Sequence, residues 1–431
     1  MAMGGGSFTS QNKILPGIYI NFISALRINP TITERGYVTF PLAMSWGKNG
    51  VTTLKVNEFE KKALELTGYE YSDEHNLPIR EAFKHAHTIY LGRLNGGGVK
   101  ARNTYGEAAF AGKRGNDLVT IISTNIDDTN KKDVSLYLGT TLVDNQTVAD
   151  ASELKDCAFF VYDKEATLED TTGLHCTGGT DETVTVNHHQ SYLNEIESYS
   201  FNALTVESSD TTIKGLYENF VKRMRDNIGI KFCSILYDRA ADYEGVINLK
   251  TKAVEGDEKL VYWLAGFEAG IDINKSCGNK VYDGELTPIV DLTQEGLKDA
   301  ILNGQLVFHK VGNEVRTLVD INSLTTTTKE KNEDFKQNQT IRTIDQIGND
   351  MAVLFNVQYN DEVPNDQDGR ITLWKDIVKL YNKYATKRAI QEVDSETIKV
   401  EPGEKKKSVV IDAPITVINC MNQAYMRVVV A

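Results

Sequence analysis

The clearest hydrophobic pattern in the chain lies between residues 371 and 388. When successive side chains are placed about 100° apart, as in an α-helix, large apolar residues gather on one side and lysines on the other. The apolar side holds Ile371, Trp374, Ile377, Val378, Tyr381, Tyr384 and Ala385, and the lysines are Lys375, Lys379, Lys383 and Lys387. The pattern predicts an amphipathic helix with a buried face and a cationic face.

Both ends of the chain alternate between apolar and polar or bulky residues with the period of a β-strand. In residues 424–431, Met426, Val428 and Val430 alternate with Tyr425, Arg427 and Val429; in residues 15–23, Ile18, Ile20 and Phe22 alternate with Tyr19 and Asn21. Residues 401–407 are interpreted as a flexible linker to the last strand. A terminal strand has to pair with a sheet edge, because unpaired backbone groups are costly. That edge can belong to the same subunit or to another copy, and the pattern leaves both open.

Between residues 99 and 190 the pattern changes to short, Thr-rich strands separated by Asn, Asp and Gly. We expect strands at 118–124, 134–138, 141–143, 158–162 and 183–186. Closely spaced strands of this kind are typical of an all-β sandwich or barrel, so an inserted β domain is predicted here. The glycine run at 96–98 is interpreted as a hinge in front of it.

The segments on either side of the insertion alternate between strands and helices. A strand at 201–206, a helix at 211–227 and a strand at 231–236 make one βαβ unit, and helices are also expected at 261–271 and 293–303. The predicted fold class is a multidomain α/β protein whose α/β core is formed by N-terminal, middle and C-terminal segments. We expect an N-terminal arm at 1–24, a small α/β domain at 25–98, the β insertion at 99–190, a larger α/β domain at 191–340 and a C-terminal domain at 341–431.

Composition narrows the class of protein. The 431 residues are 41% hydrophobic and 25% charged, which is ordinary for a globular chain, and no apolar run is long enough for a membrane span. The formal net charge of −13 argues against nucleic acid as a partner. The first residues lack a secretory pattern, so synthesis in a reducing cytoplasm is expected, and the scattered cysteines are predicted to be free thiols.

Catalytic motifs are absent from the sequence, which has no P-loop, dinucleotide fingerprint, nucleophile elbow or His-Glu-x-x-His motif. His85 and His87 would face different directions on a helix, so they are a poor metal pair. Asp238 and Asp242 follow a strand, where an α/β enzyme would place a site. They keep open the alternative of an α/β hydrolase-like enzyme, and the Thr-rich β domain keeps open that of a carbohydrate-binding protein with a β accessory domain. We assign no catalytic, cofactor-binding or metal-binding residue.

Several segments along the chain resemble tail sheath proteins of contractile phage tails, above all the PBSX-like sheaths of Gram-positive prophages and related phage-tail-like bacteriocins. The segments are MGGGSFTSQNKILPGIYINF at 3–22, INSLTTTT at 321–328, TIDQIGND at 343–350, VPNDQDGR at 363–370 and YMRVVV at 425–430. The resemblance is carried by their order over both ends and the α/β core, and it is weaker over the β domain.

The resemblance implies a structural subunit without enzymatic activity or cofactor. Such subunits stack as hexameric rings around a tail tube, contact baseplate and terminator proteins, and contract to drive the tube through a cell envelope. It implies assembly in the host bacterial cytoplasm into a phage tail or tail-like particle. It also implies that the terminal strands, with Ile18 to Phe22 and Tyr425 to Val430, join sheets of neighbouring subunits. The C-terminal region would face the tube, which makes Lys375, Lys379, Lys383 and Lys387 candidate tube contacts.

Overall fold

The computed structural model describes residues 32–430, and its largest sheet has seven strands in the order β14-β13-β12-β11-β1-β3-β2. Their bounds are β1 Tyr37–Leu42, β2 Gly50–Lys55, β3 Thr88–Arg93, β11 Ala203–Thr205, β12 Cys233–Tyr237, β13 Val246–Leu249 and β14 Gln305–Leu306. Neighbouring strands are parallel, except that β2 and β3 are antiparallel. The sheet therefore combines segments from before and after the predicted insertion, and β13 is a strand that the sequence pattern did not reveal.

Helices cover both faces of this sheet. Successive residues of a strand point to opposite faces, so each face presents its own set of apolar side chains to the helices. On one face, α1 (Val56–Thr67), α2 (Leu77–Phe83) and α5 (Val261–Gly270) pack against Val38 and Phe40. On the other face, α3 (Val186–Ile196) and α4 (Thr211–Lys222) pack against Leu204 and Leu236. The remaining elements of this part are the π-helical turn Arg223–Ile228, α6 (Gln294–Leu302), β15 (Phe308–Val311) and β16 (Glu314–Thr317).

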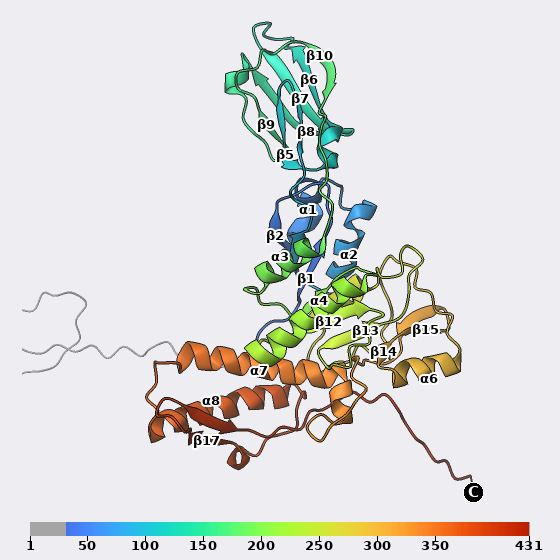
Figure 1. The fold of residues 1–431 in the computed structure, drawn as a ribbon, viewed down its shortest axis with the longest axis vertical. Coiled ribbons are helices and arrows are strands. Elements are labelled where there is room, and N and C mark those ends of the chain that lie inside the picture. Colours follow the sequence, from blue (N-terminus) through green and yellow to red (C-terminus); the bar gives the residue numbers. More distant parts are fainter. Residues whose placement is uncertain (1–31, 431) are drawn as a thin grey trace, which may run out of the picture.

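The segment between β3 and α3 forms two smaller sheets, with strand orders β10-β6-β7-β8 and β4-β5-β9. The bounds are β4 Lys100–Asn103, β5 Gly106–Ala111, β6 Leu118–Thr124, β7 Lys132–Leu138, β8 Thr141–Val148, β9 Phe160–Tyr162 and β10 Thr171–His175. Leu118 and Val134 from one sheet share a core with Ala108 and Phe160 from the other, and these strands do not close into a barrel. Figure 1 shows this β unit at one end of the molecule, far from α7 and α8.

The strand predicted at 183–186 does not form, because these residues lead into α3. Thr185 is the N-cap of that helix, and its side chain accepts a hydrogen bond from the backbone of His188. In return, the Thr185 backbone N–H donates to His188 Nδ1 at 3.0 Å. This reciprocal capping satisfies backbone donors that a strand would have paired elsewhere, so helix initiation prevails over the β preference of the Thr and Val residues.

Two chain crossings and several side chains tie the β unit to the α/β core. The Val99 backbone N–H donates to Thr180 O at 3.0 Å, and a Cβ on Gly98 would stand only 2.0 Å from that same oxygen. Gly98 is therefore required by the close approach of two backbones, whereas a Cβ on Gly96 or Gly97 would meet a side chain, that of Asn49 or Glu182. Trp46 is fully buried in the core of the β unit, and its indole Nε1 donates to Glu65 O on α1 at 3.1 Å.

The C-terminal part has its own hydrophobic cluster, built from α7 (Asn338–Gln358), α8 (Gln367–Thr386) and a hairpin of β17 (Lys399–Pro402) and β18 (Val409–Asp412). The linker predicted at 401–407 is wrong, since residues 403–408 are the turn of this hairpin and the Gly403 N–H donates to Ser408 O at 2.8 Å. The sequence pattern did not reveal β17 and β18, the two short strands that flank this lysine-rich turn. Within residues 32–430, no helix combines the length and apolar character needed to cross a bilayer. All five cysteines are free thiols, as predicted.

Candidate assembly surfaces

The last ten described residues, 421–430, extend from the body without forming a strand (Figure 1). Tyr425 is 92% exposed and Val430 is 89% exposed, and Met426, Arg427, Val428 and Val429 are exposed as well. The last backbone ties to the body are the N–H of Ile418, which donates to Ala389 O, and the N–H of Cys420, which donates to Gln339 Oε1, both at 2.9 Å. The strand predicted at 424–431 thus finds no edge within the described part of its own subunit.

The β17–β18 hairpin is a two-stranded sheet in which each strand pairs, among the described residues, only with the other. Val400, Val409 and Ile411 pack against the C-terminal cluster, whereas Val410 is 55% exposed. A two-stranded sheet with one covered face leaves a row of backbone donors and acceptors along each outer edge. The hairpin therefore offers edges to which further strands can be added.

The predicted N-terminal strand residues Ile18, Tyr19, Ile20 and Phe22 lie outside the described residues. The described chain begins beside α7, where Ile32 packs against the C-terminal cluster. The backbone N–H and the hydroxyl of Thr33 both donate to Asp350 Oδ1, at 3.2 and 2.6 Å. The described chain therefore begins against the surface of α7.

The helix predicted at 371–388 corresponds to α8, which begins four residues earlier, at Gln367. Its buried residues are Leu373, Ile377, Leu380, Tyr381 and Tyr384, so the apolar face is largely as predicted. Ile371 is an error of the prediction. It is 41% exposed, because a position two residues from Leu373 falls on the far side of a helix.

The lysines of α8 do not form a straight row opposite the buried face. Lys375, Lys379 and Lys387 are exposed, whereas Lys383 is half-buried. A four-residue step turns about 40° beyond a full circle, so lysines at this spacing wind gradually toward the buried side. The helix still presents a cationic surface at the end of the molecule opposite the β unit (Figure 1).

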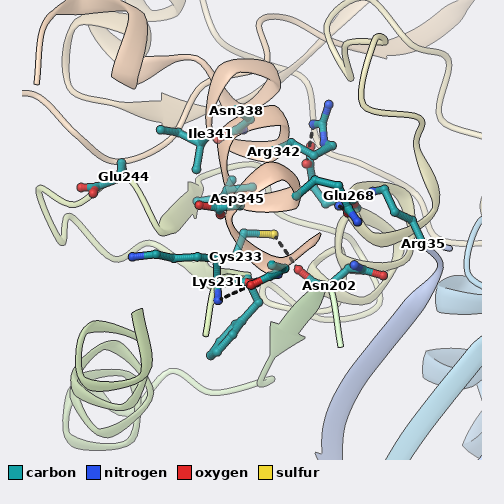
Figure 2. A pocket seen from close by; sticks show the side chains of 14 residues that line it. Arg35, Asn202, Lys231, Cys233, Glu244, Glu268, Asn338, Ile341, Arg342 and Asp345 are labelled. Carbon is teal, nitrogen blue, oxygen red and sulfur yellow. Dashed lines mark hydrogen bonds and ion pairs between the residues drawn. The ribbon is translucent and has the colours of Figure 1, made fainter. Parts of the chain in front are cut away.

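A buried ionic network that the sequence did not reveal joins α7 to the α/β core (Figure 2). Arg342 of α7 donates to Glu268 of α5 at 2.6 Å and to Asp320 at 3.2 Å, and all three side chains are nearly inaccessible to solvent. Burial raises the pKa of Glu268 to about 7, although Arg342 opposes the rise. The partners are separated by 74 and 22 positions in the sequence, so no local pattern could have identified them.

A second ion pair extends this network. Arg225 and Asp345 are 2.5 Å apart, and Arg35 donates to Gln346 Oε1 and to the carbonyl oxygen of Glu268. A cavity lined by Arg35, Glu268, Arg342 and Asp345, among others, has a volume of only about 20 Å³, roughly the space of one water molecule. This polar joint, defined here as Arg35, Arg225, Glu268, Asp320, Arg342 and Asp345, is therefore an interface between two parts of the chain and has no room for an organic ligand.

The residues considered for chemistry are engaged in structural contacts. Asp238 forms an ion pair with Lys250 at 2.8 Å. Asp242 accepts hydrogen bonds from Thr325 and Thr326, which hold its pKa well below the usual range. His85 contacts Asp283 at 3.0 Å, and within residues 32–430 no group of three or more His, Cys, Asp or Glu side chains is arranged to hold a metal ion.

Comparisons with known proteins agree along the whole chain. Residues 95–181 match the phage tail sheath protein β-sandwich domain, residues 182–323 the central domain and residues 330–431 the C-terminal domain. Two Bacillus subtilis (strain 168) proteins, the phage-like element PBSX protein XkdK and the uncharacterized protein YqbK, are each 30% identical over 99% of both chains.

Solved structures show the same likeness. A sheath tail protein from Desulfitobacterium hafniense is 32% identical with a TM-score of 0.84, covering 96% of this chain and 99% of that one. A sheath tail protein from Listeria innocua is 30% identical with a TM-score of 0.77, covering 91% and 94%. The anti-feeding prophage sheath in its contracted state, 11% identical over 97% of this chain and 99% of its own, shares the fold with a TM-score of 0.59. The chain belongs to the tail sheath protein family of contractile phage tails and tail-like particles.

Proposed function

We propose that this protein is the non-enzymatic structural subunit of a contractile tail sheath. Its subunits stack as hexameric rings around a tail tube, contact baseplate and terminator proteins at the two ends, and shorten together to drive the tube through a cell envelope. Assembly takes place in the host bacterial cytoplasm. Family membership supports the class of protein, and the free C-terminal segment supports polymerisation.

The observation that carries the proposal is the exposed segment from Tyr425 to Val430. Its β-branched residues have alternating faces but no partner strand in the described subunit, and isolated strands of this kind are aggregation-prone unless they pair. Addition of this strand to an outer edge of a neighbour's β17–β18 hairpin would satisfy its backbone groups. We assign the N-terminal residues Ile18, Tyr19, Ile20 and Phe22 to the same role at another edge.

The domains have separate roles in this proposal. The arm at 1–24 and the C-terminal domain at 341–431 link subunits, the α/β parts at 25–98 and 191–340 form the wall of the sleeve, and the β domain at 99–190 lies at its outside. The cationic surface of α8 faces the tube, at the opposite end of the molecule from the β unit (Figure 1). Exposed ion pairs with an acidic tube would be weak and screened by salt, which suits a contact that has to release.

The test is removal of the C-terminal strand. Deletion of residues 424–431 should leave the subunit folded, because these residues contribute no core contacts, but should abolish the hollow cylinders seen by negative-stain microscopy. Val428→Pro should have a similar effect, since proline removes an N–H that a ladder needs. Asn422→Pro, in the stretch between the body and the strand, is the matched control. Normal cylinders from the deletion variant would refute the linker role, and discrete monomers from the intact chain would refute the sheath function itself.

A further inference from the structure

The second half of α7 exposes apolar side chains where a surface helix ordinarily carries charges. From Met351 to Gln358 this helix has no charged residue. Val353 is 50% exposed and Val357 is 53% exposed. Because they are four residues apart, the two valines are neighbours on one face, here called the valine face. Figure 1 shows this half of α7 reaching beyond the seven-stranded sheet.

The valine face continues the side of α7 that is buried in the first half of the helix. Gln346 and Asp350 precede Val353 by seven and three positions, so they lie on the same side, and both are buried. The start of the described chain contacts both of them there: Thr33 donates to Asp350 Oδ1, and Arg35 donates to Gln346. The other oxygen of Asp350 accepts from Tyr384 of α8. The chain from Arg35 back to Ile32 therefore runs along this side of α7.

We propose that residues 24–31 of the same chain cover the valine face, with Leu26 and Ile28 packing on Val353 and Val357. Ile28 precedes Thr33 by five residues, which allows a reach of up to about 17 Å in an extended chain. Val357 lies seven residues beyond Asp350, about 10 Å along the helix axis. In an extended segment Leu26 and Ile28 point to one side and Arg27 to the other, so the apolar pair meets the valines and the guanidinium meets solvent.

This anchoring deepens the proposed function, on which its consequence rests. If residues 24–31 are held on their own subunit, only the part of the arm before residue 24 is free to reach a neighbour. The arm then leaves each subunit from the far end of α7, at a fixed place and in a fixed direction. Anchoring thus decides which neighbouring edge the residues from Ile18 to Phe22 can reach.

The experiment is hydrogen–deuterium exchange on the full-length chain, diluted until sedimentation shows monomers. Residues 24–31 should exchange about tenfold more slowly than residues 4–12, because packing on the valine face withdraws their amides from water. The double variant Val353→Asp/Val357→Asp should remove that protection. Ala352→Asp/Asn356→Asp places the same two charges on a different, exposed side of the helix and should leave the protection intact.

The possible results of the exchange experiment distinguish between the candidates for covering the valine face. Protection of residues 24–31 that appears only in polymers would mean that a neighbouring subunit or the tube covers the valine face, and it would overturn the proposal. Equal exchange in the wild-type and double-aspartate monomers would overturn it as well. Thermal unfolding of both variants verifies that the fold is kept. The exchange is measured on monomers, so its result does not depend on whether the protein forms cylinders. The sheath function is tested separately by microscopy, so failure of one proposal can be told from failure of the other.

Discussion

The two long helices of the C-terminal part differ in the residues that they bury. In α8, with 20 residues, leucine, isoleucine and tyrosine side chains face the core and lysines face outward. In α7, with 21 residues, the buried set includes Asn338, Arg342, Asp345 and Asp350, and the exposed set includes Val353 and Val357. The two helices are consecutive in the chain and contribute to one hydrophobic cluster. Their position in the chain therefore does not explain why they bury different residues.

The difference follows from what each helix meets. α8 packs within the C-terminal part, where apolar burial stabilises the fold. α7 lies between the C-terminal part and the α/β core, and the side of α7 that faces the core contributes to the polar joint. Buried ion pairs recover little more than their desolvation cost, but they tolerate only one geometry. We therefore expect the joint to fix how the C-terminal part sits on the core, while α8 contributes stability through its apolar face.

Loss of Arg342 should have the largest effect on stability. Arg342→Met leaves Glu268 and Asp320 buried without their cation, and removal of one partner of a buried pair typically costs about 3–5 kcal/mol. The measurement is urea unfolding followed by circular dichroism. Lys375→Met, an exposed position on α8, is the control and should change the unfolding free energy by no more than about 0.5 kcal/mol. Equal effects of the two substitutions would remove the contrast between the helices.

The second prediction concerns the pH dependence of that stability. The folded pKa of Glu268, about 7, lies above its ordinary value of 4.5, so between these values the folded state binds more protons than the unfolded state. Stability should therefore fall as pH rises from about 4.5 to about 7, by on the order of 3 kcal/mol from this group, and then level off.

Glu268→Gln should flatten that slope, because glutamine does not titrate. Asp238→Asn is a suitable control, since Asp238 pairs with Lys250 outside the polar joint. A slope that is unchanged in Glu268→Gln would show that this carboxyl group keeps an ordinary pKa in the folded protein.

A smaller effect is expected where the two helices touch. The Tyr384 hydroxyl of α8 donates to Asp350 Oδ2 of α7 at 2.5 Å, and both residues are buried. Tyr384→Phe should lower the unfolding free energy by about 1–3 kcal/mol, since a buried carboxylate loses a donor. Tyr381→Phe, on the same helix and 5% exposed, should cost less, because its hydroxyl has no hydrogen-bond partner among the described residues. Similar losses in both variants would mean that packing, and not the hydrogen bond, couples the helices.

The same contrast explains what could be predicted from the sequence. The apolar face of α8 was predictable because a helix that packs within its own unit repeats its contacts every three to four residues. The role of Arg342 was not, because its partners lie on α5 and after β16, and periodicity does not identify polar partners. β17 and β18 were missed because four residues each give little alternation around a lysine-rich turn. The terminal alternation from Tyr425 to Val430 indicated a strand, but a single sequence does not say whose edge it joins.

The smallest effect on stability and a large effect on assembly are expected from the cationic surface of α8. Replacement of Lys375, Lys379 and Lys383 with Glu should change the unfolding free energy by about 1 kcal/mol or less, since Lys375 and Lys379 are exposed, Lys383 is only half-buried and interactions of charges near solvent are weak. If the cationic surface of α8 binds an acidic tube, the variant should still form empty sleeves but no extended tails on the tube. Lys405, Lys406 and Lys407 changed together to Glu make the matched control, with the same change in charge placed on the hairpin turn. Wild-type tails should also lose tube attachment as salt is raised, because screening weakens such contacts. Extended tails of normal appearance from the α8 variant would refute the proposed contact between these lysines and the tube.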